Sequence, residues 1–268
     1  MSYKIAFFDM DHTLYQTHHN KIHPNDLKAL HALKQQGVYV CCSTGRPYNQ
    51  LNRILEYFNL FDYYVLINGG LVMNHEKVIL NHNPIENDDV QDIVSWCTKN
   101  QAGLLFHFGT ISTIYSKYDE IYHFCVTHHA ADILNHDPTQ SYHKEHPAYN
   151  AVFMVKNKDH VIQFVDEHPK LRYDIIEFSD NHYFIDVFPC NNDKCHGIST
   201  ILNEVNLTWK DCICFGDSTN DIGMLQKAGL GVAMGNANEA TKQSADVITT
   251  SIEEAGVYQE LKKHFDID

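Results

Sequence analysis

The most constraining feature of this sequence is a run of four apolar residues, Ile5 to Phe8, that leads directly into Asp9 and Asp11. A short unbroken apolar run near the N-terminus is typical of a strand buried on both faces of a parallel sheet. Such sheets bind ligands beyond the carboxyl ends of their strands, and residues i and i+2 of an extended segment point the same way. Two convergent carboxylates repel each other unless a cation or a shared proton intervenes. The run therefore indicates a candidate site, with a simple polar turn as the alternative interpretation.

The spacing of apolar residues follows two different patterns along the rest of the chain. Residues 1–81 and 189–268 alternate short apolar runs with helical stripes, which predicts a Rossmann-like α/β core with a parallel sheet, built from both ends of the chain. Residues 82–188 mix hairpin-like strand pairs with helices, which predicts an inserted α+β cap domain with an antiparallel sheet. We also expect a helix over residues 48–58 and a loop over 135–147.

Composition and charge narrow the class of function. The net charge is −14 and no run of Lys or Arg occurs, so the surface is poorly suited to nucleic acid or an anionic membrane, although an anionic small molecule stays possible. No apolar run reaches 18 residues and no signal peptide is evident, so we expect no membrane span. The eight cysteines lack framework spacing, which favours reduced thiols and a cytoplasmic protein. No obligate protein partner is evident.

Further polar motifs lie beside other predicted strands. Thr44 and Gly45 follow one apolar run, and Asp217 and Asp221 follow another, while Lys194 opens a helix. Each alone has an ordinary explanation, because such residues also form turns, cap helices or lie in solvent. Their combination, in this order and register, is improbable by chance.

In that order the motifs resemble those of the haloacid dehalogenase superfamily of phosphohydrolases. The trailing segment, residues 232–237 with 245–246, is similar to the Cof-type branch, whose cap is inserted between the second and third motifs. The four matching motifs are Asp9-x-Asp11-x-Thr13, Thr44, Lys194 and Gly216-Asp217-Ser218-Thr219-Asn220-Asp221.

Two positions depart from the family pattern. His12 stands where the family usually has glycine, and Cys195 stands where glycine usually follows the lysine. Neither change removes a reacting group, but both leave the fine shape of the site, and with it the choice of substrate, open.

The resemblance implies a Mg²⁺-dependent phosphatase of small phosphorylated metabolites, such as sugar phosphates, nucleotides or phosphorylated cofactors, acting through an aspartyl-phosphate. Asp9 would be the nucleophile, Asp11 the general acid and base, and Lys194 would offset the charge of Asp9 and of the phosphate. The implied phosphate-binding residues are Thr44, Gly45, Lys194 and Asn220. The implied metal site comprises Asp9, the backbone carbonyl of Asp11, Asp217 and, through water or from outside the ligand shell, Asp221.

Two other functions stay open at this point. A phosphomutase or phosphotransferase would use the same nucleophile, and a non-catalytic phosphate-binding protein would use the same fold. An intact acid at position 11 argues against the second, because binding alone needs no proton donor for a leaving group. In the cap, His107, His128, His129 and Arg172 are candidates for contact with a ligand.

Overall fold

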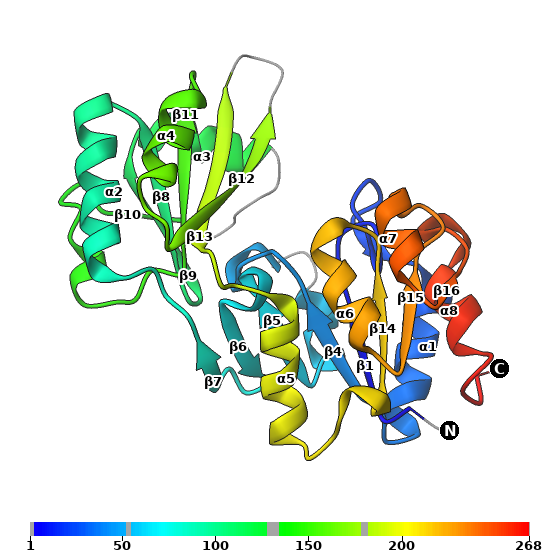
Figure 1. Ribbon diagram of the computed structural model, residues 1–268. Coiled ribbons are helices and arrows are strands. Elements are labelled where there is room, and N and C mark those ends of the chain that lie inside the picture. Colours follow the sequence, from blue (N-terminus) through cyan, green and yellow to red (C-terminus); the bar gives the residue numbers. More distant parts are fainter. Residues whose placement is uncertain (1–2, 52–54, 128–133, 178–181, 268) are drawn as a thin grey trace. The chain divides into compact units, whose positions relative to one another are not determined.

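The computed structural model describes residues 3–51, 55–127, 134–177 and 182–267. Contacts divide the chain into two compact units (Figure 1): unit 1 holds Met1–Arg46, Arg53–His82 and Asp193–Asp268, and unit 2 holds Pro47–Asn52 and Asn83–Asn192. In the described ranges, none of the helices combines the length and the apolar character that crossing a membrane requires.

Unit 1 is built on an eight-stranded sheet of order β16-β15-β14-β1-β4-β5-β6-β7. Neighbouring strands are parallel from β16 to β5, and only β6 and β7 run antiparallel to their neighbours. The predicted α/β fold class, a parallel core with an added α+β part, is thereby confirmed. The strands are β1 Ile5–Phe8, β4 Tyr39–Ser43, β5 Tyr63–Leu66, β6 Leu71–Asn74, β7 Ile79–His82, β14 Cys212–Gly216, β15 Leu230–Ala233 and β16 Val247–Ile248, with a separate small hairpin of β2 Tyr15–Gln16 and β3 Lys21–Ile22.

The register of the central strands aligns their carboxyl ends. Phe8, the last residue of β1, pairs with Phe215 of β14 on one side and with Cys42 of β4 on the other. All four residues of β1 are buried, as expected for a strand covered on both faces. The polar residues that follow these strands therefore lie along one edge of the sheet.

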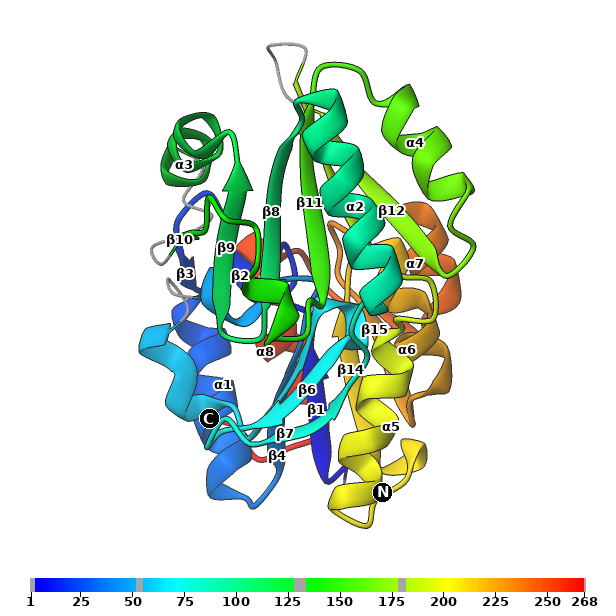
Figure 2. The same ribbon diagram turned by 90° about the vertical axis from the view of Figure 1, so that its left-hand side faces the viewer.

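Helices cover both faces of this sheet (Figures 1 and 2). On one face α1 packs against α8, and on the other α5, α6 and α7 pack in succession. The α-helices of unit 1 are α1 Pro24–Gln35, α5 Lys194–Glu204, α6 Ile222–Lys227, α7 Glu239–Ser244 and α8 Gly256–Leu261, and its 3₁₀ helices are η2 Leu55–Leu60, η3 Ile67–Gly69, η5 Trp209–Asp211, η6 Thr219–Asp221 and η7 Ile252–Glu254.

Unit 2 is built on a six-stranded sheet of order β10-β9-β8-β11-β13-β12, antiparallel except between β9 and β10. One face packs its apolar side chains against α2 and α4, and the other packs against α3. Its elements are η1 Tyr48–Leu51, α2 Asn87–Asn100, β8 Gly103–Phe108, β9 Ile111–Ser116, α3 Tyr118–Thr127, β10 Leu134–His136, η4 Tyr142–Lys144, β11 Asn150–Val155, α4 Asp159–Asp166, β12 Leu171–Glu177 and β13 Tyr183–Pro189.

Two local predictions are wrong. In the described part of residues 48–58 the expected α-helix is replaced by the tighter 3₁₀ helices η1 and η2, and η1 is held by the hydrogen bond from Asn49 to Ser112. Residues 135–147 are not only a loop, because β10 adds an edge strand beside β9 and η4 follows it.

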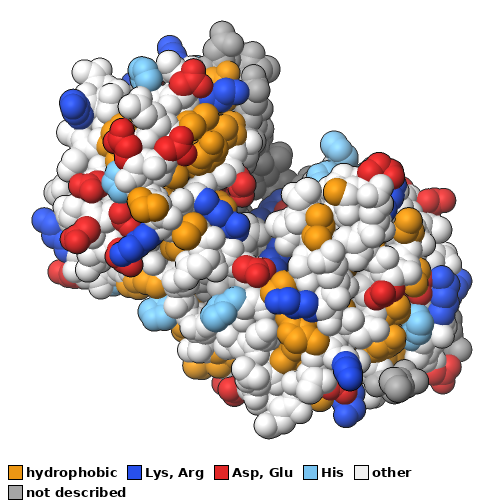
Figure 3. All heavy atoms as spheres, in the orientation of Figure 1, with side chains coloured by type: hydrophobic (Ala, Val, Ile, Leu, Met, Phe, Trp, Pro, Cys, Tyr) orange, Lys and Arg blue, Asp and Glu red, His pale blue; other side chains and the backbone are white. Residues whose placement is uncertain are grey.

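Charged side chains are mixed on the surface. On the face drawn in Figure 3, the described acidic and basic side chains lie interspersed, without a continuous basic strip.

Candidate active site

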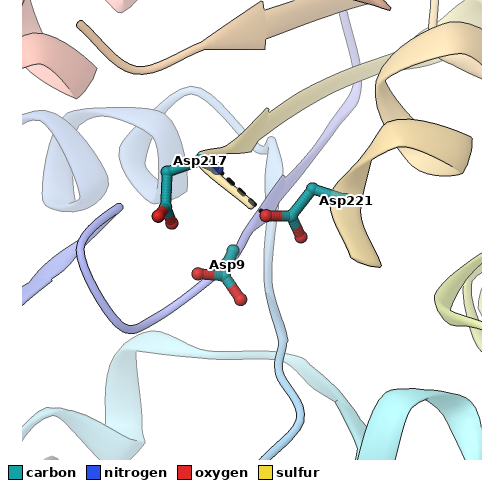
Figure 4. A group of neighbouring side chains, drawn as sticks. All are labelled: Asp9, Asp217 and Asp221. Atoms are coloured by element: carbon teal, nitrogen blue, oxygen red, sulfur yellow. Dashed lines mark hydrogen bonds between the residues drawn. The ribbon is translucent and has the colours of Figure 1, made fainter. Parts of the chain in front are cut away.

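Three carboxylates meet at the aligned strand ends of unit 1 (Figure 4). Asp9 follows β1, Asp217 follows β14, and Asp221 ends the short η6 turn at the start of α6. One oxygen from each lies within 4.8 Å of the others. The sequence separates Asp9 from the other two by about two hundred residues, and the pairing of β1 with β14 brings them together.

A buried ammonium lies among these carboxylates. Lys194 Nζ donates to Asp9 Oδ1 over 2.6 Å and to Asp221 Oδ1 over 2.7 Å, and its side chain is wholly buried. Burial lowers the pKa of Lys194, but Asp221 and Asp9 outweigh that effect and raise it. Lys194 is the first residue of α5, and Asp193 caps that helix by accepting from the Cys195 N–H over 2.8 Å. The helix start thus holds the lysine in position.

Both oxygens of Asp221 are occupied. Its Oδ1 accepts from Lys194, and its Oδ2 accepts from the backbone N–H groups of Asp217 and Ser218, each over 3.0 Å. Gly216 makes this approach possible, because a Cβ there would lie 2.5 Å from Asp221 Cβ. Asp221 therefore fixes the loop that presents Asp217.

Among the described residues, Asp217 and Asp9 each keep one carboxylate oxygen without a hydrogen-bond partner. Thr13 donates its hydroxyl to Asp217 Oδ1 over 2.8 Å, so Thr13 braces this loop. Burial is the main cause that raises the pKa of both Asp217 and Asp9, and the neighbouring carboxylates add to it. Thr13 opposes the rise at Asp217, and Lys194 opposes it at both. Carboxylates so placed are stabilised in their ionised form by an added cation.

Asp11 forms an ion pair that the sequence analysis missed. Arg46 donates to both oxygens of Asp11, from Nε and from Nη2, over 2.6 Å each. Arg46 comes directly after Gly45, so its position beside a predicted motif was the only signal that could have pointed to it. The two-point geometry fits the planar fork of a guanidinium.

The predicted phosphate-binding residues lie in two turns. Thr44 is buried, and its hydroxyl accepts from the backbone N–H of Arg46 over 3.1 Å. Gly45 lies against Asn68, whose side-chain oxygen accepts from Asn220 Nδ2 over 2.9 Å. Asn68 has a left-handed backbone and was not singled out from the sequence. Among the described residues, no side-chain hydrogen bond joins Thr44 or Asn220 to the three carboxylates.

The two departures from the family pattern have local explanations. His12 has a left-handed backbone with φ of 63°, a conformation that glycine adopts freely, and its carbonyl accepts from Asn236 Nδ2 over 2.8 Å. Cys195 is buried, and a Cβ on Gly223 of α6 would lie 2.8 Å from its sulfur. The missing glycine of α5 is thus matched by a glycine on the neighbouring helix.

The candidate ligand residues of the cap have other partners or cannot be described. His107 is buried and contacts Ser112, and Arg172 donates to the carbonyl of Asn192 over 2.6 Å. His128 and His129 lie outside the described residues.

Comparison with known proteins agrees with this geometry. A family model described as haloacid dehalogenase-like hydrolase matches residues 6–261. The chain is 27% identical to the 5-amino-6-(5-phospho-D-ribitylamino)uracil phosphatase YitU of Bacillus subtilis, over 99% of this chain and 98% of that protein. It is 27% identical to an HMP-PP phosphatase of Yersinia enterocolitica, over 90% and 87%. Among solved structures, a protein of Geobacillus kaustophilus is similar with a TM-score of 0.86 and 29% identity, covering 97% of this chain and 98% of that one.

Proposed function

This chain belongs to the haloacid dehalogenase-like hydrolases and is a hydrolase of phosphate monoesters, and we propose that it acts on small phosphorylated metabolites through an aspartyl-phosphate formed on Asp9. The observation that carries the proposal is the buried Lys194 between Asp9 and Asp221. A lysine held there lowers the cost of bringing a phosphate dianion to a carboxylate. The neighbouring Asp11 supplies the acid that a pure phosphate-binding site would not need.

Asp9 is suited to nucleophilic attack. Lys194 holds its Oδ1, and the described residues offer no hydrogen bond to its Oδ2, which stays available. That oxygen would bond to phosphorus while the ester P–O bond breaks and its electron pair leaves with the alkoxide. Water would then attack the phosphorus of the aspartyl-phosphate, so that inorganic phosphate departs and the carboxylate of Asp9 returns. Splitting the reaction lowers the barrier of each step.

Asp11 would move the protons of both steps. It would protonate the departing alkoxide and later take a proton from the attacking water. In this structure its carboxylate is held at two points by Arg46, so it must leave at least one of these bonds to act. Arg46 is therefore a positioning residue, which holds the acid ready beside Asp9.

The residues present fit Mg²⁺. The carboxylate groups of Asp9 and Asp217 are hard ligands within one cluster, and Mg²⁺ takes few carboxylates together with water. Asp9, Asp217 and the carbonyl of Asp11 would hold the ion, while Asp221, with both oxygens occupied, would act through its neighbours or through water. When bound, the ion supplies positive charge to the oxygens of the transferring phosphoryl group.

The proposal also covers the phosphate-binding residues, the class of substrate and the cellular location. Thr44, Gly45 and Asn220 would contact the phosphoryl group, and residues 82–188 would act as the cap. The relatives act, by their names, on phosphorylated small molecules, which supports a substrate of that kind. All eight cysteines are free thiols, which supports a cytoplasmic location.

Phosphate release from a panel of phosphorylated metabolites, with Mg²⁺ or with a chelator, tests this proposal. Asp9→Asn should lower release by about 10³-fold or more, because it removes the group that forms the intermediate. Asp166→Asn, an exposed aspartate at the end of α4, is the matched control and should release phosphate at the wild-type rate.

Three outcomes would count against the proposal. Wild-type protein that releases nothing from any ester contradicts hydrolysis. Transfer of phosphate between positions of a sugar would instead support the phosphomutase. Full activity in chelator would remove the role of the metal.

A further inference from the structure

A hollow of about 510 Å³ lies in unit 2, at the end of its sheet opposite to the points where the chain passes to unit 1. It is lined where β11 ends and where β13 begins, whereas β13 leaves toward unit 1 from its other end, at Pro189. The seven residues of β13 span roughly 20 Å at about 3.3 Å per residue. The hollow therefore lies at the end of unit 2 drawn uppermost in Figure 1.

Basic side chains outnumber acidic ones in its lining, although the whole chain carries a net charge of −14. Lys117, Lys156, His160 and His182 all contribute, and the acidic residue among the lining side chains, Glu120, is paired with Lys117 over 3.2 Å. In the part of the chain that the structure describes, neither Lys156 nor His160 forms an ion pair or a side-chain hydrogen bond. In Figure 3 the uppermost surface of unit 2 shows basic and histidine side chains near one another, beside acidic ones.

An aromatic side chain lines the hollow together with these basic groups. Trp96 lines the hollow and is fixed from behind by Phe153 and Phe164, at ring separations of 5.7 Å and 5.6 Å. Gln101, whose left-handed backbone ends α2, adds an amide to the lining. A half-buried indole offers its surface to a planar ring, while lysine and imidazole groups donate to an oxyanion.

We propose that this hollow is a second binding site, for a small organic phosphate that carries a planar ring, and that it binds this ligand without hydrolysing it. The volume lies within the range of about 300–1,000 Å³ that is usual for small-molecule sites. The unpaired Lys156 and His160 would take the phosphate, and Trp96 the ring. The carboxylate cluster found among the described residues lies in unit 1, so the hollow holds no comparable set of groups for phosphoryl transfer.

The two tryptophans of the chain allow a direct test. Trp209 lies in unit 1, so the variant Trp209→Phe leaves Trp96 as the reporter of the hollow. Combined with Asp9→Asn, which keeps the ligand intact, this protein is titrated in chelator with adenosine monophosphate and, separately, with inorganic phosphate. We expect saturable changes of Trp96 fluorescence with the nucleotide, and calorimetry that gives two sites for it per chain.

Variants of the hollow decide between this site and an indirect response. Adding Lys156→Gln and His160→Gln should weaken the fluorescence response by about tenfold or more and leave one calorimetric site. Lys28→Gln, an exposed lysine of α1, is the matched control and should change neither. A response that survives the double variant, or no Trp96 response to either probe up to about 10 mM, overturns the proposal. The fluorescence of Trp96 reports the hollow alone, so that result stands whether or not the proposed catalytic scheme holds. The other calorimetric site is the one proposed in unit 1, and its absence would count against that proposal only.

Discussion

Both units bury a cluster of polar side chains, but the two clusters differ in charge. The charged cluster of unit 1 is Asp9, Asp221 and Lys194, and the neutral cluster of unit 2 is His107, Ser112 and Asn49. In unit 1 Asp9 and Asp221 lie beside Lys194, whose positive charge offsets part of theirs. In unit 2 His107 is buried with no counter-ion among the described residues, and burial lowers its pKa to about 3. That imidazole is therefore neutral at ordinary pH, and its environment needs only hydrogen bonds.

The neutral cluster of unit 2 is a chain of hydrogen bonds. Asn49 Nδ2 donates to Ser112 Oγ over 2.6 Å, and Ser112 in turn lies against His107 Nδ1. Because Ser112 Oγ accepts from the amide of Asn49, the hydroxyl proton of Ser112 can point to the imidazole of His107. The charged cluster can drive chemistry because its fixed charges act on a substrate, whereas the neutral one fixes η1 against the sheet.

Lys194→Met should give the largest effect, because it removes the cation from the charged cluster. We expect kcat to fall by about 10³-fold. The free energy of unfolding should also fall, by roughly 3 kcal/mol near pH 8 and by less near pH 5, where a proton can take the place of the ammonium between the carboxylates. Steady-state kinetics and urea unfolding at the two pH values measure both changes.

Lys28→Met, at an exposed site on α1, is the control for Lys194→Met and should alter neither quantity. Activity of Lys194→Met within tenfold of wild type would show that the cluster does not need its cation.

Asp11→Asn should come next, with an effect that depends on the leaving group. For an alkyl phosphate we expect a loss of kcat of about 10²–10⁴-fold, because the alkoxide needs a proton as it departs. For p-nitrophenyl phosphate, whose phenolate leaves without one, the loss should stay within about tenfold. Equal losses for the two substrates would assign Asp11 to binding instead of proton transfer.

The carboxylate cluster could be anticipated from the sequence for a physical reason. Apolar runs such as Ile5 to Phe8 predict buried parallel strands, and the carboxyl ends of such strands meet at one edge. The neighbours of β1 are β4 and β14, and β14 lies about two hundred residues away. That pairing followed from the family resemblance, because local pattern does not specify which strands become neighbours.

Other features could not be read from the sequence. Arg46 shows no sign of its partner Asp11, because the ion pair exists only once β1 and β4 lie side by side. The α-helix expected over residues 48–58 was wrong, because a local pattern does not reveal contacts with distant residues, such as that of Asn49 with Ser112, which holds the 3₁₀ helix η1. His107 was predicted as a candidate contact for a ligand. Its burial and its bond with Ser112 depend on tertiary packing, which the alternation of apolar and polar residues along a strand does not predict.

His107→Leu tests the neutral cluster through the pH dependence of stability. The pKa of His107 is lower in the folded chain than the value of about 6.5 for an unfolded one, so its contribution is present above pH 6.5 and is lost as the pH falls toward 3. Between pH 7.5 and pH 4 the wild type should lose about 3 kcal/mol that the variant does not lose. Urea unfolding of both proteins across this range measures the difference.

His31→Leu, on α1, is the control for the other histidines of the chain and should keep the wild-type slope. Parallel curves for wild type and His107→Leu would mean that His107 takes up its proton without unfolding unit 2.

Asp26 is an exception to the contrast between a charged cluster in unit 1 and a neutral one in unit 2, and we expect its substitution to change stability least. This carboxylate lies in unit 1 and is fully buried. Among the described residues its Oδ1 accepts from the Tyr258 N–H over 2.8 Å, and its Oδ2 has no partner. Burial raises its pKa to about 7. A buried acid without a cation thus resembles His107 more than Asp9, so the nearby counter-charge, and not the unit, decides which state a buried group takes.

The raised pKa of Asp26 fixes the sign of the prediction. Its contribution to stability is present below the unfolded value near 4 and is lost as the pH rises through 7. Asp26→Asn keeps the acceptor for α8 without the charge, so from pH 5.5 to pH 8 it should gain about 2 kcal/mol relative to wild type in urea unfolding. Asp88→Asn, an exposed aspartate in the first turn of α2, is the matched control and should follow the wild type. If Asp26→Asn also follows the wild type, Asp26 must find a cation or water on ionising, and counter-charge would no longer separate it from Asp9.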